Sequence, residues 1–368
     1  MNKVILLFVF LILTSCSAQN PPVPSQFPEE TSNYQKLFDA REVDGVKCFR
    51  IPALVTAPNG DLIAAIDERA LGCADLRGSK DINIVIRRSQ DNGKTWGDIE
   101  TVVDFPFGVS ASDPSMIVDQ ETGEVFLFYN YMDLENEKDI YYLQFVKSSD
   151  NGKTWSKPKD ITSQITKDQW YNDFKFITSG HGIQAQSGRL LHTLVDLDKG
   201  VYLFGSDDHG ASWFFIDSPV NPADESKVIE LDNGDYMINS RVNGGMGYRY
   251  VHISHDKGKT WETRPEKELT DPGNNASIVV YPYHKNGKTE NLLLFTNSNN
   301  RDSRKNLTIK VSYDQGKTWS AGKVIYPGSA AYSSMTVLEN GDIGVFFEKD
   351  DYTENVFVSF PIEFVTQN

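Results

Sequence analysis

Positive charge is scarce in this 368-residue sequence, and so are the motifs of several common enzyme classes. Lys and Arg total 36 against 51 Asp and Glu, and the formal net charge of −15 argues against nucleic acid or an anionic membrane surface as the main partner. The six histidines are scattered, and no H-E-x-x-H pattern or Cys-Cys-His group is present to bind zinc. There is no G-x-S-x-G turn, no phosphate-binding loop and no D-x-D-x-D-G calcium loop. The sequence therefore gives no reason to expect a cofactor.

The longest apolar run is at the N-terminus, where MNKVILLFVFLILTSC combines one lysine with a continuous apolar stretch. This stretch is short for a permanent membrane span and is typical of a secretory signal. Its L-T-S-C ending resembles the lipobox of bacterial lipoproteins, whose cysteine becomes the lipidated first residue. We expect residues 1–16 to be a lipoprotein signal with lipidation at Cys16, which predicts an exported protein of the periplasm or outer membrane. An ordinary signal peptide is the alternative.

Cysteine is rare, since only Cys48 and Cys73 remain after the signal. In an exported protein these two residues can form a disulfide, and two free buried thiols agree equally well with the sequence. Residues 17–38 carry four prolines and are interpreted as a tether.

Helical periodicity is also missing. Short apolar or alternating runs such as DLIAAID, INIVIRRS and NLLLFTN are separated by Asn-Gly, Asp-Asn-Gly and Pro-Gly turns. With 39% hydrophobic residues the chain can bury a substantial core. The pattern predicts an all-β protein.

One eight-residue pattern, S-x-D-x-G-x-(T/S)-W, occurs five times. The copies SQDNGKTW, SSDNGKTW, SDDHGASW, SHDKGKTW and SYDQGKTW begin at residues 89, 148, 206, 254 and 312. Asp and Gly suit a tight turn, and each copy would bury one tryptophan at the same place in successive units: Trp96, Trp155, Trp213, Trp261 and Trp319. We interpret these boxes as scaffold and not as ligand sites.

A repeat of about 58 residues fits one four-stranded sheet, the blade of a β-propeller. Residues 39–368 have room for roughly six such blades. Only five blades carry a box, so we expect the remaining blade to be closed jointly by strands from the two chain ends. The predicted fold is a six-bladed β-propeller of four-stranded antiparallel blades.

The sequence Phe49-Arg50-Ile51-Pro52 lies upstream of the first box. FRIP followed by repeated Asp boxes resembles the bacterial exo-α-sialidases (neuraminidases), a family of six-bladed propellers. The resemblance extends over the whole chain after the tether. It implies a hydrolase that acts on the sialylated glycans of glycoproteins, glycolipids and mucins.

The resemblance implies three arginines that bind the substrate carboxylate: Arg50, Arg241 and Arg301. Planar guanidinium groups suit a carboxylate, and a sialoside carries one on its anomeric carbon. Arg304 is a close rival of Arg301.

Three further residues match the family's catalytic groups. A neutral phenol avoids the repulsion that a carboxylate nucleophile would meet, so sialidases depart from the usual two-carboxylate mechanism. The resemblance implies Tyr332 as this nucleophile and Glu225 as its base, with Glu230 as the rival of Glu225. The general acid lies in the loop DERALGCADLRGSKD, where Asp75 is preferred over Asp67 and Asp81.

Supporting positions also match the family. Arg69 and Asp113 resemble the pair that contacts the O4 region of the sugar, and Glu348 resembles the carboxylate that holds the first arginine. Loop residues bonded to backbone are the alternative for Arg69 and Asp113.

The expected reaction is retaining hydrolysis of terminal sialic acid. A propeller that binds sialosides without cleaving them is the main alternative, and a variant of the same fold that transfers sialic acid or forms an anhydro product is another. The residues favour an enzyme, because a binding protein has no need of a nucleophile and a base. We expect a monomer that contacts a membrane only through its N-terminal lipid.

Overall fold

Antiparallel strands make up nearly all of the structure, in agreement with the alternating apolar runs. The computed structural model describes residues 34–244, 246–285 and 287–367. The leader with Cys16 and most of the proposed tether lie outside these residues. Within the described ranges, no helix is long and apolar enough to cross a membrane.

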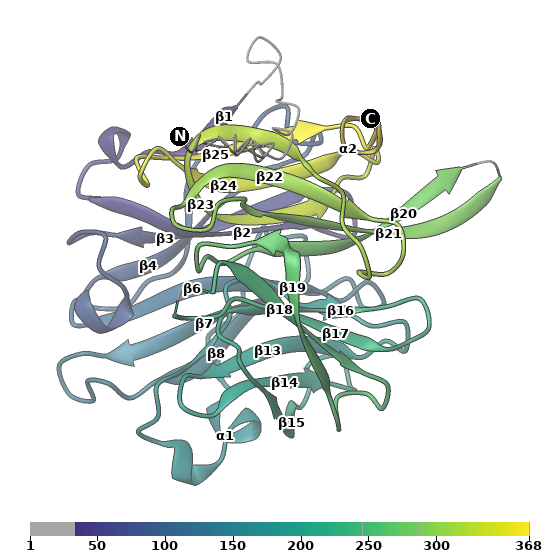
Figure 1. Ribbon diagram of the computed structural model, residues 1–368. Helices are drawn as coiled ribbons and strands as arrows, with labels where there is room; N and C mark the ends of the chain where they lie inside the picture. Colours follow the sequence, from purple (N-terminus) through teal and green to yellow (C-terminus); the bar gives the residue numbers. More distant parts are fainter. Residues whose placement is uncertain (1–33, 245, 286, 368) are drawn as a thin grey trace, which may run out of the picture.

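The described strands form six blades, which confirms the predicted six-bladed propeller (Figure 1). The first blade contains β2 (Cys48–Thr56), β3 (Leu62–Arg69), β4 (Ile82–Ser89) and β5 (Glu100–Val103). The second contains β6 (Val109–Val118), β7 (Val125–Asp133), β8 (Tyr142–Ser148) and β9 (Lys159–Asp160). The third contains β13 (Leu190–Asp196), β14 (Gly200–Ser206) and β15 (Phe214–Val220), with the short β10 (Lys175–Ile177) and β12 (Ile183–Gln184) along β13. Between these two short strands, β11 (Gly180–His181) pairs in parallel with β6 of the second blade.

The second half of the chain continues the same order. The fourth blade contains β16 (Ser226–Glu230), β17 (Tyr236–Ser240), β18 (Tyr248–Ser254) and β19 (Glu262–Thr270). The fifth contains β20 (Ser277–Lys285), β21 (Lys288–Ser298), β22 (Lys305–Ser312) and the first part of β23 (Lys323–Val337). The later part of β23 pairs with β24 (Ile343–Lys349), which pairs with β25 (Glu354–Phe360), so one long strand belongs to both the fifth and the sixth blade. Short helical turns lie in the connections: η2 (Ala40–Glu42), η3 (Leu76–Gly78), α1 (Thr162–Ile165), η4 (Asp168–Trp170) and α2 (Glu363–Thr366).

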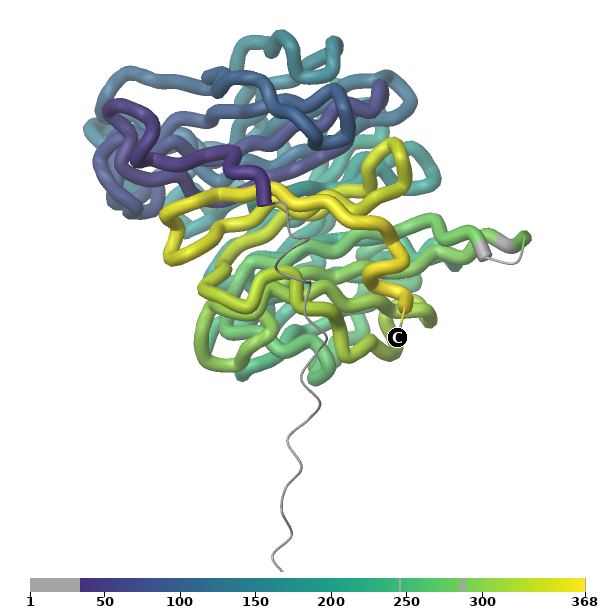
Figure 2. Tube along the Cα trace, turned by 90° about the horizontal axis from the view of Figure 1, so that it is seen from above, coloured from purple at the N-terminus to yellow at the C-terminus, as the bar shows by residue number. Residues whose placement is uncertain are grey.

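The sixth blade is closed by strands from both chain ends, as the missing sixth box predicted. Strand β1 (Gln35–Phe38) pairs with β25, and the N-terminal and C-terminal segments run side by side in Figure 2. The tether boundary at residue 38 was therefore set too late. The propeller begins earlier because the apolar pair Leu37 and Phe38 is buried in the core. The ring of Phe38 packs 5.3 Å from that of Phe49.

Each box is a turn between the third and fourth strands of its blade. In the first box, Asp91 Oδ1 accepts a hydrogen bond from the backbone N–H of Thr95 at 2.8 Å, and the Ser89 hydroxyl accepts one from the N–H of Gly93 at 2.9 Å. Asn92 and Gly93 have φ values of 59° and 79°, the left-handed conformation that Gly and Asn tolerate. The box side chains thus satisfy one another.

The boxes also join neighbouring blades. A Cβ atom on Gly93 would lie 2.3 Å from Phe357 of the sixth blade, and one on Gly152 would lie 2.7 Å from Ile63 of the first. Trp96 packs against the same Phe357, with ring centroids 5.1 Å apart. The tryptophans of all five boxes pack into the hydrophobic clusters of the described chain. The repeat is therefore structural, as predicted.

Candidate active site

One end of the propeller carries most of the predicted site residues. A cavity of about 470 Å³ at this end is lined by Asp75, Asp113, Glu225, Arg241 and Tyr332. Much of the remaining lining is apolar and comprises Ile51, Leu76, Tyr141, Phe174, Phe176 and Leu197. Charged groups that can orient a ligand and apolar surface that can cover it therefore occur in one pocket.

A second cavity of about 470 Å³ lies at the opposite ends of the inner strands, where it is lined by Thr56, Val118, Glu230 and Val337. Glu230 forms an ion pair there with Lys257 at 3.1 Å. The rival of Glu225 is thus placed away from Tyr332, because Glu225 directly precedes β16 and Glu230 ends it.

Irregularities in three strands direct side chains into the site. The pairing register shifts in β2 between Arg50 and Ala53, in β6 between Ser112 and Ser115, and in β23 between Ala330 and Ser333. A bulge re-aims the side chains around it. Ile51 and Asp113, which lie within two of these segments, have φ values of 68° and 63°. Such values are unfavourable for a β-branched residue, and the N–H of Ile51 is held by a 2.9 Å hydrogen bond to Glu348 Oε1.

Tyr332, Glu225 and Arg241 form the centre of the site. The Tyr332 hydroxyl donates a hydrogen bond to Glu225 Oε2 at 2.8 Å. Arg241 Nη1 contacts the same carboxylate oxygen at 2.5 Å and donates to the Tyr332 hydroxyl at 3.0 Å. Tyr332 is only 7% exposed, and so is Glu225. A phenol, a carboxylate that can accept its proton and a cation are therefore in direct contact.

The charges around Tyr332 act on its pKa in opposite directions. Burial and the Glu225 carboxylate raise the pKa of the phenol well above its ordinary value, while Arg241, Arg304 and Arg50 lower it in part. Tyr332 is consequently neutral at physiological pH. It can act as a nucleophile only if Glu225 takes its proton as the new bond forms.

Glu348 links the first arginine to the tyrosine. Its side chain is fully buried, and Oε1 accepts a hydrogen bond from Arg50 Nε at 2.7 Å. Oε2 accepts one from the backbone N–H of Tyr332 at 3.0 Å. One face of the Arg50 guanidinium is covered by the ring of Tyr352, whose centroid lies 4.0 Å from Cζ. A buried carboxylate and an aromatic ring thus fix one arginine.

The third arginine beside Tyr332 is Arg304, and the structure does not place Arg301 there. Arg301 is exposed and donates to the backbone oxygen of Met246 at 3.4 Å. Arg304 Cζ lies 5.3 Å from the centroid of the Tyr332 ring, and its Nη1 donates to the Tyr352 hydroxyl at 3.1 Å. Arg301 lies against Gly247, where a Cβ would come 2.6 Å from Nε, whereas Arg304 Nη2 donates to the Gly273 backbone oxygen at 3.3 Å. This corrects the sequence prediction.

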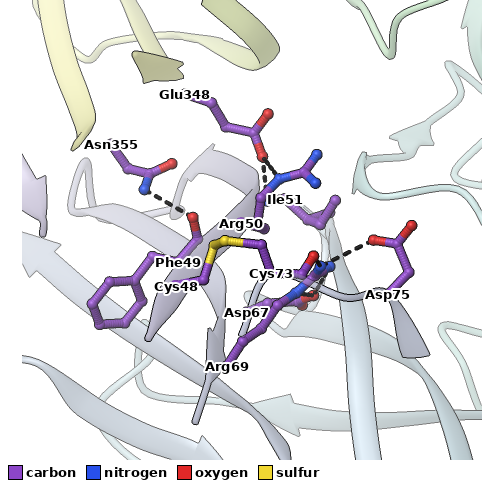
Figure 3. Close-up of a disulfide and its surroundings, with 10 residues drawn as sticks. All are labelled: Cys48, Phe49, Arg50, Ile51, Asp67, Arg69, Cys73, Asp75, Glu348 and Asn355. Carbon is purple, nitrogen blue, oxygen red and sulfur yellow. Dashed lines mark hydrogen bonds and ion pairs between the residues drawn. A yellow bond between two sulfur atoms is a disulfide. The ribbon is translucent and has the colours of Figure 1, made fainter. Parts of the chain in front are cut away.

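The loop between β3 and β4 brings Asp75 to the cavity. The side chain of Asp75 is 82% exposed and accepts a 2.9 Å hydrogen bond from Arg69 Nη1. Asp67 is fully buried and holds the other edge of Arg69, with contacts of 3.1 and 2.8 Å (Figure 3). Asp81 directly precedes β4, and its backbone oxygen accepts from Ala70 N at 3.2 Å. Of these three acids, Asp75 alone lines the cavity.

Asp113 and Asp67 form a pair of neighbouring carboxyl groups. The backbone N–H of Asp113 donates to Asp67 Oδ1 at 2.9 Å, and Asn130 Nδ2 donates to Asp113 Oδ2 at 3.1 Å. Burial and the nearby Asp67 raise the pKa of Asp113 to about 8, although Arg69 opposes the shift. Arg69 is fully buried and supports the loop through its contacts with Asp67 and Asp75.

The two cysteines form a disulfide, which settles a question that the sequence left open. Cys48 begins β2 and Cys73 lies in the loop that carries Asp75, with their Cα atoms 5.2 Å apart. Figure 3 shows the bond between the strand of Arg50 and the segment leading to Asp75.

Sequence reasoning did not find Asp224, Asn243 and Tyr352. Asp224 lies 3.6 Å from Arg241 Nε and accepts a 2.6 Å hydrogen bond from Asn243 Nδ2. The acidic pair in ADES was a signal for Asp224, because it precedes the residue assigned as base. The chain has sixteen tyrosines, and no local pattern distinguishes Tyr352.

Comparisons with known proteins agree with this fold. The family model described as a BNR repeat-like domain matches residues 60–345. The chain is 36% identical over 332 residues to a sialidase of Micromonospora viridifaciens, covering 83% of this chain and 50% of that protein. It is 31% identical over 337 residues to a sialidase of Bacteroides fragilis, covering 83% and 60%. The chain thus spans about half of the first relative and 60% of the second.

A solved structure, the Hadza microbial sialidase Hz136, superimposes with a TM-score of 0.81 at 28% identity and covers 90% of this chain and 69% of that chain. The fold and the pocket define a propeller related to glycoside hydrolases. The chain belongs to the sialidase family of BNR-repeat propellers.

Proposed function

We propose that this protein is a retaining exo-α-sialidase that releases terminal sialic acid from glycoproteins, glycolipids and oligosaccharides. The observation that carries the proposal is the 2.8 Å hydrogen bond from the Tyr332 hydroxyl to Glu225, with Arg241 against both groups. A carboxylate-bearing sugar needs cations for binding, and a neutral nucleophile avoids repulsion at its anomeric carbon.

Substrate binding uses the three arginines around the tyrosine ring. Arg50 and Arg304 have Cζ atoms 5.6 and 5.3 Å from the ring centroid, and Arg241 reaches the hydroxyl. Together they hold the sialic acid carboxylate above Tyr332. The binding energy fixes the anomeric carbon C2 next to the phenolic oxygen.

In the first step, Asp75 donates a proton to the glycosidic oxygen as the bond between this oxygen and C2 breaks. The Tyr332 oxygen forms a bond to C2, and its proton moves to Glu225 Oε2, with which it is already hydrogen-bonded. The products of this step are a glycosyl-tyrosine and the free leaving group.

In the second step, Asp75 takes a proton from water, whose oxygen attacks C2. The bond between C2 and the Tyr332 oxygen breaks, and the phenol regains its proton from Glu225. Two displacements at the same carbon retain its configuration. Asp75 returns to its protonated form, and free sialic acid leaves.

The decisive experiment compares wild type with Tyr332→Phe on an α-sialoside, with the product followed by proton NMR. We expect wild type to release the α-anomer first and Tyr332→Phe to lose roughly 10³-fold in kcat. Unchanged thermal unfolding of the variant would show that only the chemistry is lost. Binding without release by folded wild type would instead establish a sialoside-binding propeller. An anhydro or transferred product would replace hydrolysis with a related reaction.

A further inference from the structure

We propose that the Cys48–Cys73 disulfide positions the general acid, so that its reduction lowers the rate of glycosidic bond cleavage. This inference rests on the proposed function and assigns the disulfide a part in it. The bond joins the first residue of β2 to a residue two positions before Asp75. The same strand carries Arg50, so the disulfide ties the acid loop to an arginine of the site (Figure 3).

The loop has little other support before Asp75. Residues 73–75 are exposed, and Leu71 is 56% exposed. Directly after Asp75 the chain is anchored, because Leu76 is 4% exposed and packs with Met132, Leu134 and Tyr141. Asp75 therefore lies between a covalent anchor on one side and an apolar anchor on the other.

Arg69 connects Asp75 to the residue that the disulfide holds. Its Nη1 donates to the Cys73 backbone oxygen at 2.7 Å and to Asp75 Oδ1 at 2.9 Å. The opposite edge of the guanidinium is fixed by Asp67. The two N–H groups of Nη1 thus bind Asp75 and the residue that the disulfide holds. Releasing Cys73 frees this carbonyl and adds mobility to the residues that lead to the carboxyl group.

A reductant in solution can reach the disulfide from the Cys73 side. Cys73 is exposed, whereas Cys48 is only 2% exposed. A thiolate of dithiothreitol can attack the sulfur of Cys73, which forms a mixed disulfide and releases Cys48 as a thiolate. The second thiol of the reagent then closes its ring and releases Cys73. Dithiothreitol supplies both electrons, and the protein gains two thiols.

The test separates acid catalysis from general stability by the choice of leaving group. A nitrophenyl α-sialoside has a good leaving group that needs little protonation, whereas sialyllactose has a poor one that needs the acid. For the double variant Cys48→Ser/Cys73→Ser we expect kcat to fall roughly tenfold on sialyllactose and less than twofold on the nitrophenyl substrate. KM should change little on either, because the arginines are untouched.

Two comparisons complete the experiment. Lys80→Ala removes a surface ion pair of the same loop, at 3.3 Å from Glu135, and should leave both rates unchanged. Dithiothreitol should reproduce the selective loss in wild type, reversibly, and have no effect on the double variant. If the double variant fails to fold, the dithiothreitol treatment of wild type still tests the proposal. Circular dichroism then checks that the reduced wild type remains folded.

Equal losses on both substrates, or no loss, would overturn the proposal and leave the sialidase function standing. Cleavage of neither substrate by wild type would overturn the function itself, and the inference with it.

Discussion

The two ends of the propeller are built on different principles. At the box end, five turns repeat the same contacts, and the hydrogen bond from the glycine N–H to the serine hydroxyl measures 2.7–2.9 Å in all five. At the site end, Glu225 of the fourth blade meets Tyr332 of the strand shared by the fifth and sixth, and Arg50 of the first meets Glu348 of the sixth. Box residues satisfy one another within a turn, whereas several site residues also find partners in other blades.

This difference separates stability from activity. A turn that is complete in itself can be copied from blade to blade, and each copy contributes to packing against the preceding blade. A site assembled across blades cannot be copied, because each loop supplies one different side chain to a single pocket. Substitutions at the box end should therefore change the free energy of unfolding with little effect on the reaction, whereas substitutions that remove site side chains should change the reaction.

The largest expected effect tests the correction at the site end. Arg304→Ala removes the cation 5.3 Å from the Tyr332 ring. Truncating one partner of a desolvated charge pair costs about 3–4 kcal/mol, so we expect kcat/KM for a sialoside to fall roughly 10²- to 10³-fold. Steady-state kinetics measures this loss.

Arg301→Ala is the matched control, since it removes an arginine three residues earlier in the same loop. Arg301 is exposed and bonds only weakly to Met246, so its loss should change kcat/KM less than about twofold. A large effect of Arg301→Ala with a small one of Arg304→Ala would restore the assignment made from sequence and contradict this structure.

At the box end, Gly152→Ala should destabilise the protein without changing its activity. The residue has a φ of 79°, and a new Cβ would lie 2.7 Å from Ile63 Cδ1 in the neighbouring blade. Left-handed backbone and overpacking together cost about 2 kcal/mol or more. Denaturant unfolding measures the change.

Gly123→Ala isolates the part that is due to backbone conformation. Its φ is 78°, but nothing lies within 4 Å of the new Cβ, so the expected cost is about 1 kcal/mol. Equal costs for the two variants would show that the box glycine has no role in joining the blades. Reduced kcat in Gly152→Ala would break the proposed separation of the two ends.

The structure of the box end could be predicted from the sequence because its interactions are local. Ser89, Asp91 and Thr95 contact one another within seven residues, so the repeat contains the whole turn. The closure of the sixth blade also followed, since five boxes left one blade to be completed by the chain ends. The start of the propeller was misplaced because two apolar residues after a proline-rich stretch form too short a pattern to identify a strand.

The residues of the site end could be predicted only where the resemblance to a known family identified them. Glu225 and Tyr332 are 107 positions apart, and no local pattern brings them together. Arg301 and Arg304 lie in one short loop. Which of them contacts Tyr332 depends on the conformation of this loop, which the sequence does not show. The disulfide could not be predicted from the sequence, because two cysteines can pair only if their backbones approach within a few ångströms.

The last comparison takes one carboxyl group from each end and follows its effect on stability as a function of pH. At the site end, burial and Asp67 raise the pKa of Asp113 to about 8. At the box end, the hydrogen bonds from Thr154 lower the pKa of Asp150 to about 2. An unfolded aspartate has a pKa near 4. Between about pH 4 and 8, folded Asp113 keeps a proton that the unfolded chain has lost, so its contribution to stability falls as the pH rises.

Asp113→Asn removes this titration and keeps an oxygen that can accept the hydrogen bond from Asn130. The variant should therefore gain stability relative to wild type between pH 5 and pH 8, which denaturant midpoints at several pH values can measure. Asp150→Asn is the matched control. Asp150 is ionised in both states above about pH 5, so its contribution is constant there and is lost only as the pH falls toward 2. If the stability difference between Asp113→Asn and wild type does not change with pH over this range, Asp113 is ionised in the folded protein. The carboxyl groups at the two ends would then have the same charge state.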